Sequence, residues 1–205
     1  MKNMKELFDL VKKLRDRIEK YGDLLRGNET LTRYVLIDSV LRALGWDTEN
    51  PDIVVPEERH EGGRPDYVLY HNGKKLIAIE AKSLDTRFDE KEVVDRGFRY
   101  CYRVGEIQYF IITDGNIWKV YKVYEPQPSK RLVLEINIRK DRVEDIVRKL
   151  LSLWRPLIRY EIEEVKPIIK GKKEVEKVIE KQAKPMFCLL YTSPSPRDLS
   201  TSRMP

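Results

Sequence analysis

The 205-residue sequence predicts an α/β fold in which a mixed central β-sheet is flanked by helices. Two predicted helices come first, three short strands follow, and a third helix separates them from later strands and a last helix. Two turn sequences, Asn72-Gly73 and Asp114-Gly115-Asn116, are typical of β-hairpins. A mixed sheet with helices around it accommodates this order of elements best.

The N-terminal part of the chain predicts two helices. Residues 4–26 form an amphipathic helix, because their apolar residues recur mostly every three or four positions. These apolar positions are Leu7, Leu10, Val11, Leu14, Ile18 and Leu25. Gly27-Asn28 ends this helix, and Asn28 can cap a second helix over residues 29–44, which Gly45 ends.

Apolar runs between turn residues predict strands in the rest of the domain. The predicted strands cover residues 53–55, 66–70, 76–81, 107–113, 117–124 and 132–138. A third helix is predicted over residues 89–104, although Gly97 costs about 1 kcal/mol relative to alanine within a helix. A last helix is predicted over residues 141–154, with Asp141 as its cap and Pro156 as its stop.

Composition excludes several classes of protein. Charged residues make up 36% of the chain and hydrophobic residues 41%, with a formal net charge of +6. No apolar run approaches the roughly 20 residues of a membrane helix, and the charged N-terminus has no signal-peptide core. We therefore expect a cytoplasmic protein with no membrane partner. Cys101 has no CxxC partner and is expected to pack in the core.

The most informative segment is the apolar strand that ends in Glu80 and Lys82. The two-residue period of a strand places these two side chains on one face. The preceding strand opens with Asp66, which the hairpin brings back beside Glu80. A plain two-residue turn would pair Asp66 with Ile79 instead and put Glu80 on the opposite face. We therefore predict a β-bulge that brings Asp66 opposite Glu80.

Two carboxylates that converge in this way repel one another unless a cation lies between them. Oxygen ligands favour Mg²⁺, which takes one or two carboxylates and keeps several waters; Mn²⁺ can substitute for it. A lysine beside them can orient or deprotonate an attacking water, or stabilise charge on a phosphorane-like oxyanion. Asp66, Glu80 and Lys82 thus predict metal-assisted phosphodiester hydrolysis, with both carboxylates as metal ligands.

These residues also support a resemblance. The segment Gly63-Arg64-Pro65-Asp66-Tyr67 followed by Ile79-Glu80-Ala81-Lys82 resembles the PD-(D/E)XK nuclease motif. The form is closest to the N-terminal nuclease domain of type I restriction enzyme R subunits, over roughly residues 29–124. Further similarity lies in Asn28-Glu29-Thr30, Leu36-Ile37, Leu44-Gly45-Trp46-Asp47, Ile112-Thr113-Asp114-Gly115 and Trp118.

The resemblance implies a restriction-endonuclease-like core and a Mg²⁺-dependent DNA endonuclease. It adds Glu29, at the start of the family's first core helix, to the catalytic set of Asp66, Glu80 and Lys82, acting through a water. The family's helix after the lysine often has Gln and Tyr four residues apart; Tyr100 matches, whereas Arg96 stands at the Gln position. The implied DNA contacts are Arg96, Tyr100 and Arg64.

Structural alternatives remain open for several of these residues. Asp66 could be a turn residue and Glu80–Lys82 an exposed alternation at a sheet edge. Glu29 could be a carboxylate favoured by the helix dipole. Asp38 most simply forms a surface pair with Arg42, four residues later.

Three hypotheses about function follow. DNA is the expected partner of a nuclease, together with other restriction-system subunits or a downstream helicase domain. The sequence has no G-x-x-x-x-G-K-[ST] motif, so ATP-driven translocation is not implied here. The first alternative is a catalytically inactive nucleic-acid-binding or assembly module on the same fold. The second is a protein-interaction adaptor built on the first helix and residues 157–187.

The domain prediction has three parts. Residues 1–155 form the nuclease-like domain with its N-terminal helix, and residues 156–187 form a charged helical extension. From Cys188 onward Ser, Thr and Pro replace Lys, Glu, Ile and Val, and CLLYTSPSPRD resembles one reading frame of a transposase-type sequencing adapter. Residues 188–205 are therefore expected to be a non-native, disordered tail, with a natural Ser/Pro tail as the alternative. Whether the natural chain continues past Phe187 stays open.

Overall fold

The computed structural model describes residues 4–87, 89–156 and 158, all of which lie in the first of two units, Met1–Lys166. The predicted tail over residues 188–205 lies outside the described residues. So does the predicted extension over residues 156–187, except for Pro156 and Ile158. Among the helices that are described, none has the length and hydrophobicity needed to cross a membrane.

The core is a six-stranded mixed sheet in the order β1-β2-β3-β4-β5-β6, which confirms the predicted α/β fold. Strands β3 and β4 run parallel, and every other neighbouring pair runs antiparallel. Helix α4 (Glu90–Val104) supplies the crossover that a parallel pair requires. The strands are β1 (Val54–Pro56), β2 (Tyr67–His71), β3 (Lys74–Ala81), β4 (Tyr109–Thr113), β5 (Ile117–Lys122) and β6 (Leu132–Asn137).

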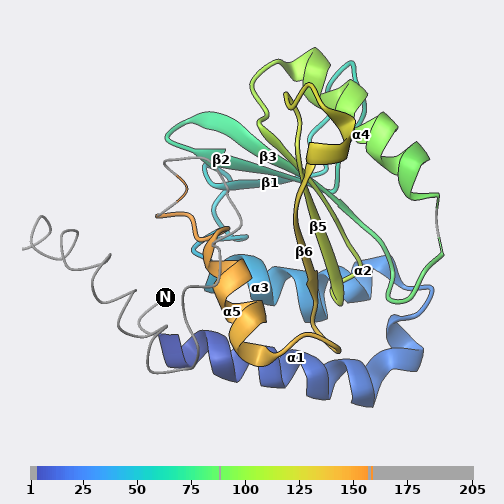
Figure 1. Cartoon of the computed structure of the whole chain (residues 1–205), viewed down its shortest axis with the longest axis vertical. Coiled ribbons are helices and arrows are strands. Elements are labelled where there is room, and N and C mark those ends of the chain that lie inside the picture. Colours follow the sequence, from blue (N-terminus) through green and yellow to red (C-terminus); the bar gives the residue numbers. More distant parts are fainter. Residues whose placement is uncertain (1–3, 88, 157, 159–205) are drawn as a thin grey trace, which may run out of the picture. The chain divides into compact units, whose positions relative to one another are not determined.

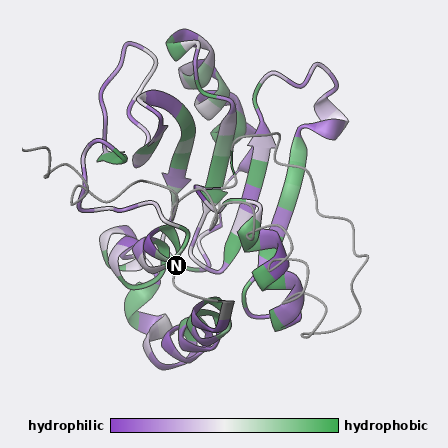
Figure 2. Ribbon diagram, turned by 90° about the vertical axis from the view of Figure 1, so that its left-hand side faces the viewer, coloured by the Kyte–Doolittle hydropathy of each residue, from purple (hydrophilic) through white to green (hydrophobic). Residues whose placement is uncertain are grey.

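Helices cover both faces of the sheet. Helix α4 lies on one side, whereas α1, α3 and α5 lie on the other (Figure 1). The remaining elements are α1 (Met4–Leu25), α2 (Glu29–Thr32), the π-helix η1 (Arg33–Ile37), α3 (Asp38–Ala43), the 3₁₀-helix η2 (Pro128–Lys130) and α5 (Val143–Leu151). Hydrophobic residues are concentrated in the strands between these layers (Figure 2).

Gly97 explains how α4 comes so close to the sheet. A Cβ atom at this position would lie 2.1 Å from Phe110 Cζ on β4, which is far inside contact distance. The helix interior therefore tolerates a glycine because the Phe110 ring fills the space of its side chain. Cys101, one turn further along α4, is fully buried in the same cluster, as predicted.

Two predicted helices differ from the observed ones. Asn28 caps the second helix as predicted, accepting a hydrogen bond from Leu31 N at 2.9 Å, but a π-helical segment over Arg33–Ile37 interrupts it. The predicted capping role of Asp141 is wrong, because α5 begins only at Val143. The Asp141 carboxylate instead accepts a hydrogen bond from the Asn137 backbone N–H, in the turn after β6.

Candidate active site

The β2–β3 hairpin has the register that was predicted for it. Asn72 and Gly73 both have positive φ angles, 51° and 73°, as a tight two-residue turn requires. The register shifts at Leu69/Tyr70, and beyond this bulge Tyr67 pairs with Ile79. One residue further along, Asp66 lies opposite Glu80, so the predicted bulge is confirmed.

The Asp66 carboxylate is held at the end of β2 by two donors. Its Oδ2 accepts the Ala81 backbone N–H at 2.7 Å, and its Oδ1 lies 3.3 Å from Arg33 Nη1. Burial nevertheless raises the pKa of Asp66 to about 6, and the neighbouring charges of Glu80 and Glu29 add to this rise. The surroundings of Asp66 therefore destabilise its charged form relative to its protonated form.

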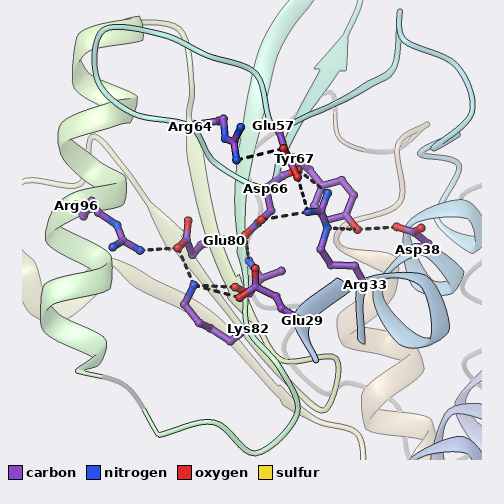
Figure 3. A network of polar contacts seen from close by, with 11 residues as sticks. Glu29, Arg33, Asp38, Glu57, Arg64, Asp66, Tyr67, Glu80, Lys82 and Arg96 are labelled. Atoms are coloured by element: carbon purple, nitrogen blue, oxygen red, sulfur yellow. Dashed lines mark hydrogen bonds and ion pairs between the residues drawn. The ribbon is translucent and has the colours of Figure 1, made fainter. Parts of the chain in front are cut away.

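Lys82 joins the two other predicted carboxylates. Its Nζ lies 2.7 Å from Glu80 Oε1 and 3.8 Å from Glu29 Oε2, and it donates a hydrogen bond to the Ala81 carbonyl at 2.8 Å. Glu80 and Lys82 come from β3, whereas Glu29 reaches the site from the first turn of α2 (Figure 3). The structure thus brings the four predicted catalytic residues to one end of the sheet.

The predicted DNA contacts occupy three different environments. Arg96, on α4, pairs with Glu80 at 2.5 Å and is 53% exposed. Arg64 lies in the loop before β2 and pairs with Glu57 at 3.3 Å. Tyr100 is buried beneath this loop, and its hydroxyl has no hydrogen-bond partner within the described part of the chain. Its ring is therefore not presented to a DNA strand in this structure.

Sequence analysis missed Arg33, whose side chain is only 14% exposed and lies in the middle of the site. Besides Asp66 it contacts Glu57 at 3.2 Å, and its guanidinium stacks over the Tyr67 ring at 4.6 Å from the centroid. A signal was available, because Arg33 follows Glu29 by four residues. Residues spaced four apart on a helix share a face, so a Glu29 that faces the site predicts the same of Arg33.

The surface role assigned to Asp38 is also corrected. Asp38 does lie 4.0 Å from Arg42, but it is buried, and its Oδ1 accepts a hydrogen bond from the Tyr67 hydroxyl at 2.7 Å. This bond also raises the pKa of Tyr67, which burial raises most, so the hydroxyl keeps its proton. Asp38 therefore anchors Tyr67 beneath Arg33.

The oxygen atoms at the end of β3 are of the chemical type that a hard divalent cation binds. The Lys82 ammonium already lies among oxygens of Glu80, Ala81 and Glu29. Within residues 4–87, 89–156 and 158, no three His, Cys, Asp or Glu side chains are grouped to hold a metal ion. Asp66 and Glu80 supply two carboxylates, which is within what Mg²⁺ uses when waters complete its coordination. These two residues would hold the ion.

Comparison with known proteins shows what parts of the chain resemble. Residues 58–129 match the sequence profile of a family described as type I restriction enzyme R protein N terminus. Among solved structures, the chain is similar to the type IIG restriction endonuclease BpuSI, with 16% sequence identity and a TM-score of 0.38. That alignment covers 72% of this chain and 18% of the endonuclease chain. No curated protein sequence matches the chain significantly.

The matched segment runs from the loop before β2 to the turn before β6, so it includes Asp66, Glu80 and Lys82 but not Glu29 or Arg33. The resemblance predicted from the sequence is confirmed over this segment, because residues 58–129 are similar to the N terminus of type I restriction enzyme R proteins.

Proposed function

We propose that this domain is a metal-dependent deoxyribonuclease that hydrolyses phosphodiester bonds of DNA, with Mg²⁺ as its cofactor and Mn²⁺ as a substitute. The observation that supports this most strongly is the placement of Asp66 opposite Glu80 with Lys82 on the same face. The family match over residues 58–129 makes DNA the expected substrate. Such a protein would act on DNA in the cytoplasm, together with restriction-system subunits or a helicase domain.

Each residue of the site has a separate role in this proposal. Asp66 and Glu80 would hold the cation, which when bound supplies charge neutralisation for the phosphate and acidifies a water. Lys82, fixed by Glu80 and the Ala81 carbonyl, would orient the attacking water or stabilise the negative charge that develops on phosphorus oxygens. Glu29, which is 43% exposed, would complete the acidic set through a water.

One observation favours the alternative, a catalytically inactive nucleic-acid-binding or assembly module. Glu80 Oε1 is paired with both Lys82 and Arg96, so this carboxylate is already neutralised without a metal ion. In a binding module these pairs would serve the fold, and Arg96 would not need to release Glu80. The two functions therefore differ in whether the protein cleaves DNA when a divalent cation is supplied, and the nuclease in addition requires Lys82.

Cleavage of supercoiled plasmid DNA by the full chain tests the proposal. Nicking or cutting is expected with Mg²⁺ or Mn²⁺, whereas Ca²⁺ should support binding without turnover, because it accepts oxygen ligands in looser geometry. Lys82→Ala should lower the cleavage rate by at least about 100-fold, the effect typical of removing a group that stabilises developing charge. The matched control is Lys74→Ala, which removes an exposed lysine from the other end of β3.

Cleavage that is absent with every cation, combined with DNA binding, would support the inactive module instead. Cleavage that Lys82→Ala leaves undiminished would remove the role assigned to this lysine. A contaminating nuclease would be equally active in preparations of wild type, Lys74→Ala and Lys82→Ala, so the three proteins must be purified in parallel.

A further inference from the structure

Arg33 makes two contacts with the same aspartate. It is the first residue of η1 and reaches the end of β2, where its Nη1 lies 3.3 Å from Asp66 Oδ1 and its Nη2 3.2 Å from Asp66 O (Figure 3). One guanidinium group therefore holds both the side chain and the backbone of Asp66. Single-turn π-helical segments are often found at functional sites, and this one begins at the residue that makes these contacts.

Arg33 is itself held in place from below. Its Nε donates to the Tyr67 hydroxyl at 3.2 Å, and the Tyr67 hydroxyl donates in turn to buried Asp38 at 2.7 Å. The ring of Tyr67 lies under the guanidinium at 4.6 Å. The contacts thus form a continuous chain from Asp38 through Tyr67 and Arg33 to Asp66. Each link joins a helical residue either to β2 or to Asp66, the residue directly before β2.

The consequence for Asp66 is a fixed carboxylate. One oxygen is anchored by Arg33 and the other by the Ala81 N–H at 2.7 Å. Each carboxylate oxygen can accept more than one bond, so both oxygens retain capacity for a further partner. Because the two anchors hold different oxygens, the carboxylate cannot rotate without losing one of them, and its free lone pairs keep their direction.

We propose that Arg33 is a positioning residue that fixes the Asp66 carboxylate in the orientation required for binding the metal ion. The inference rests on the proposed function, because it assigns Arg33 to the same site. It differs from a role in charge balance, which would require a positive charge near Asp66 and no particular geometry.

The two roles predict opposite effects on metal affinity. If Arg33 only balanced charge, Arg33→Met would leave Asp66 more negative and strengthen cation binding, and Arg33→Lys would behave like wild type. If Arg33 fixes the carboxylate, Arg33→Met weakens cation binding by at least about 10-fold, the loss typical when a group that orients a metal ligand is removed. Arg33→Lys should not restore the affinity, because an ammonium cannot reproduce the planar fork.

Two measurements on the full chain test this. Titration with Mn²⁺, followed by calorimetry or by the EPR signal of free Mn²⁺, gives the metal affinity. Amide hydrogen exchange in EDTA, followed by NMR, reports the Ala81 N–H that donates to Asp66. In Arg33→Met this amide should exchange at least about 10-fold faster relative to the Ile79 amide of the same strand, because local opening of the Asp66 contact becomes easier.

The matched control is Arg139→Met, since Arg139 is also a partly exposed arginine that pairs with an aspartate, Asp85, outside the site. It should leave both the Ala81 exchange rate and the Mn²⁺ affinity unchanged. An unchanged Ala81 exchange rate in Arg33→Met, or tighter Mn²⁺ binding, would overturn the positioning role. If the wild type bound no Mn²⁺, the proposed function would fail, while the exchange measurement would still decide whether Arg33 fixes Asp66.

Should Arg33→Met unfold, Arg33→Lys provides the same decision. This variant keeps the positive charge over the Tyr67 ring, so it is expected to fold. Wild-type Ala81 exchange and Mn²⁺ affinity in Arg33→Lys would overturn the inference, whereas faster exchange with weaker binding would support it.

Discussion

Asp66 and Asp85 have opposite electrostatic surroundings. Asp66 lies directly before β2, and Asp85 follows Lys82 by three residues. Burial and the charges of Glu80 and Glu29 raise the pKa of Asp66 to about 6. Hydrogen bonds from Arg139 lower the pKa of Asp85 below its usual value of 3.8, and Arg26 contributes to the same effect. The charged form is therefore destabilised in Asp66 and stabilised in Asp85.

The contacts explain this difference. Both oxygens of Asp85 accept hydrogen bonds from Arg139, at 2.8 and 3.0 Å, in the bidentate geometry of a strong ion pair. Asp66 has a single, longer contact from Arg33 to its side chain. Asp85 thus has the features of a structural contact, which joins the loop after β3 to the turn after β6. Asp66 has fewer contacts with positive groups than Asp85 has. This is expected of a carboxylate whose proposed role is to bind a cation.

Removing each charge should separate the two roles most clearly in catalysis. Asp66→Asn is expected to lower the Mg²⁺-dependent cleavage rate by at least about 100-fold, because a cation ligand is lost at the site of developing charge. Asp85→Asn should leave the rate within about threefold of wild type, since the partners of the Asp85 carboxylate, Arg139 and Arg26, are outside the proposed catalytic set. Initial rates of plasmid cleavage measure both. Equal losses of cleavage rate in the two variants would contradict the catalytic role assigned to Asp66.

Cation binding should sharpen the same contrast in stability. At a Mg²⁺ concentration 100 times its Kd, the wild type should gain about 2.7 kcal/mol in its free energy of unfolding. Asp85→Asn should gain the same amount and Asp66→Asn almost nothing. Urea denaturation with EDTA and with Mg²⁺ gives these differences. A wild type that Mg²⁺ leaves unchanged, together with a strongly destabilised Asp66→Asn in EDTA, would show that Asp66 serves the fold.

The raised pKa of Asp66 gives a third test, in EDTA. The folded protein holds the Asp66 proton more tightly than the unfolded chain does, so its stability should fall as the pH rises from about 4 to about 6. For a carboxyl group with this burial, we expect a fall of roughly 2 kcal/mol. Asp66→Asn should lack this fall, so the difference between the two unfolding curves isolates it. If the free energies of unfolding of the two proteins ran parallel between pH 4 and pH 6, the fold would not destabilise the charged form of Asp66.

Local sequence patterns predicted most of the fold because the relevant interactions are local. The Asn72-Gly73 turn fixed the β2–β3 hairpin, and the two-residue period placed Glu80 and Lys82 on one face. The patterns could not show the π-helical segment in residues 29–44, because the apolar residues Leu31, Val35, Leu36, Val40 and Leu41 recur at the spacing of an ordinary α-helix.

The parts of the site that sequence missed depend on contacts between distant segments. The spacing of four residues from Glu29 indicates which face of the helix Arg33 lies on. It does not specify that Arg33 meets Asp66, which is 33 residues away. Tyr100 was expected to face DNA, but the loop before β2 covers it, with Gly62 so close that a Cβ there would lie 2.9 Å from Tyr100 Cα. Loop conformation depends on such packing, so periodicity along a helix cannot predict it.

The lowered pKa of Asp85 predicts the smallest effect, with the opposite sign to that of Asp66. The ion pair with Arg139 stabilises the fold when Asp85 is charged, so its contribution is complete above pH 3.8 and is lost as the pH falls through the lower pKa of the folded state. Because both side chains are about one-third exposed, the contribution should stay below about 1 kcal/mol.

Asp85→Asn is the suitable variant for this measurement. Asp85 has a φ of +57°, a conformation that asparagine adopts more readily than most residues, so the substitution changes the charge with little backbone strain. In urea denaturation the variant should be less stable than the wild type at pH 6 and equally stable near pH 2. A loss of stability that persisted unchanged at pH 2 would mean that Asp85 acts through its backbone geometry. The ion pair with Arg139 would then not stabilise the fold, and Asp85 would no longer be the electrostatic opposite of Asp66.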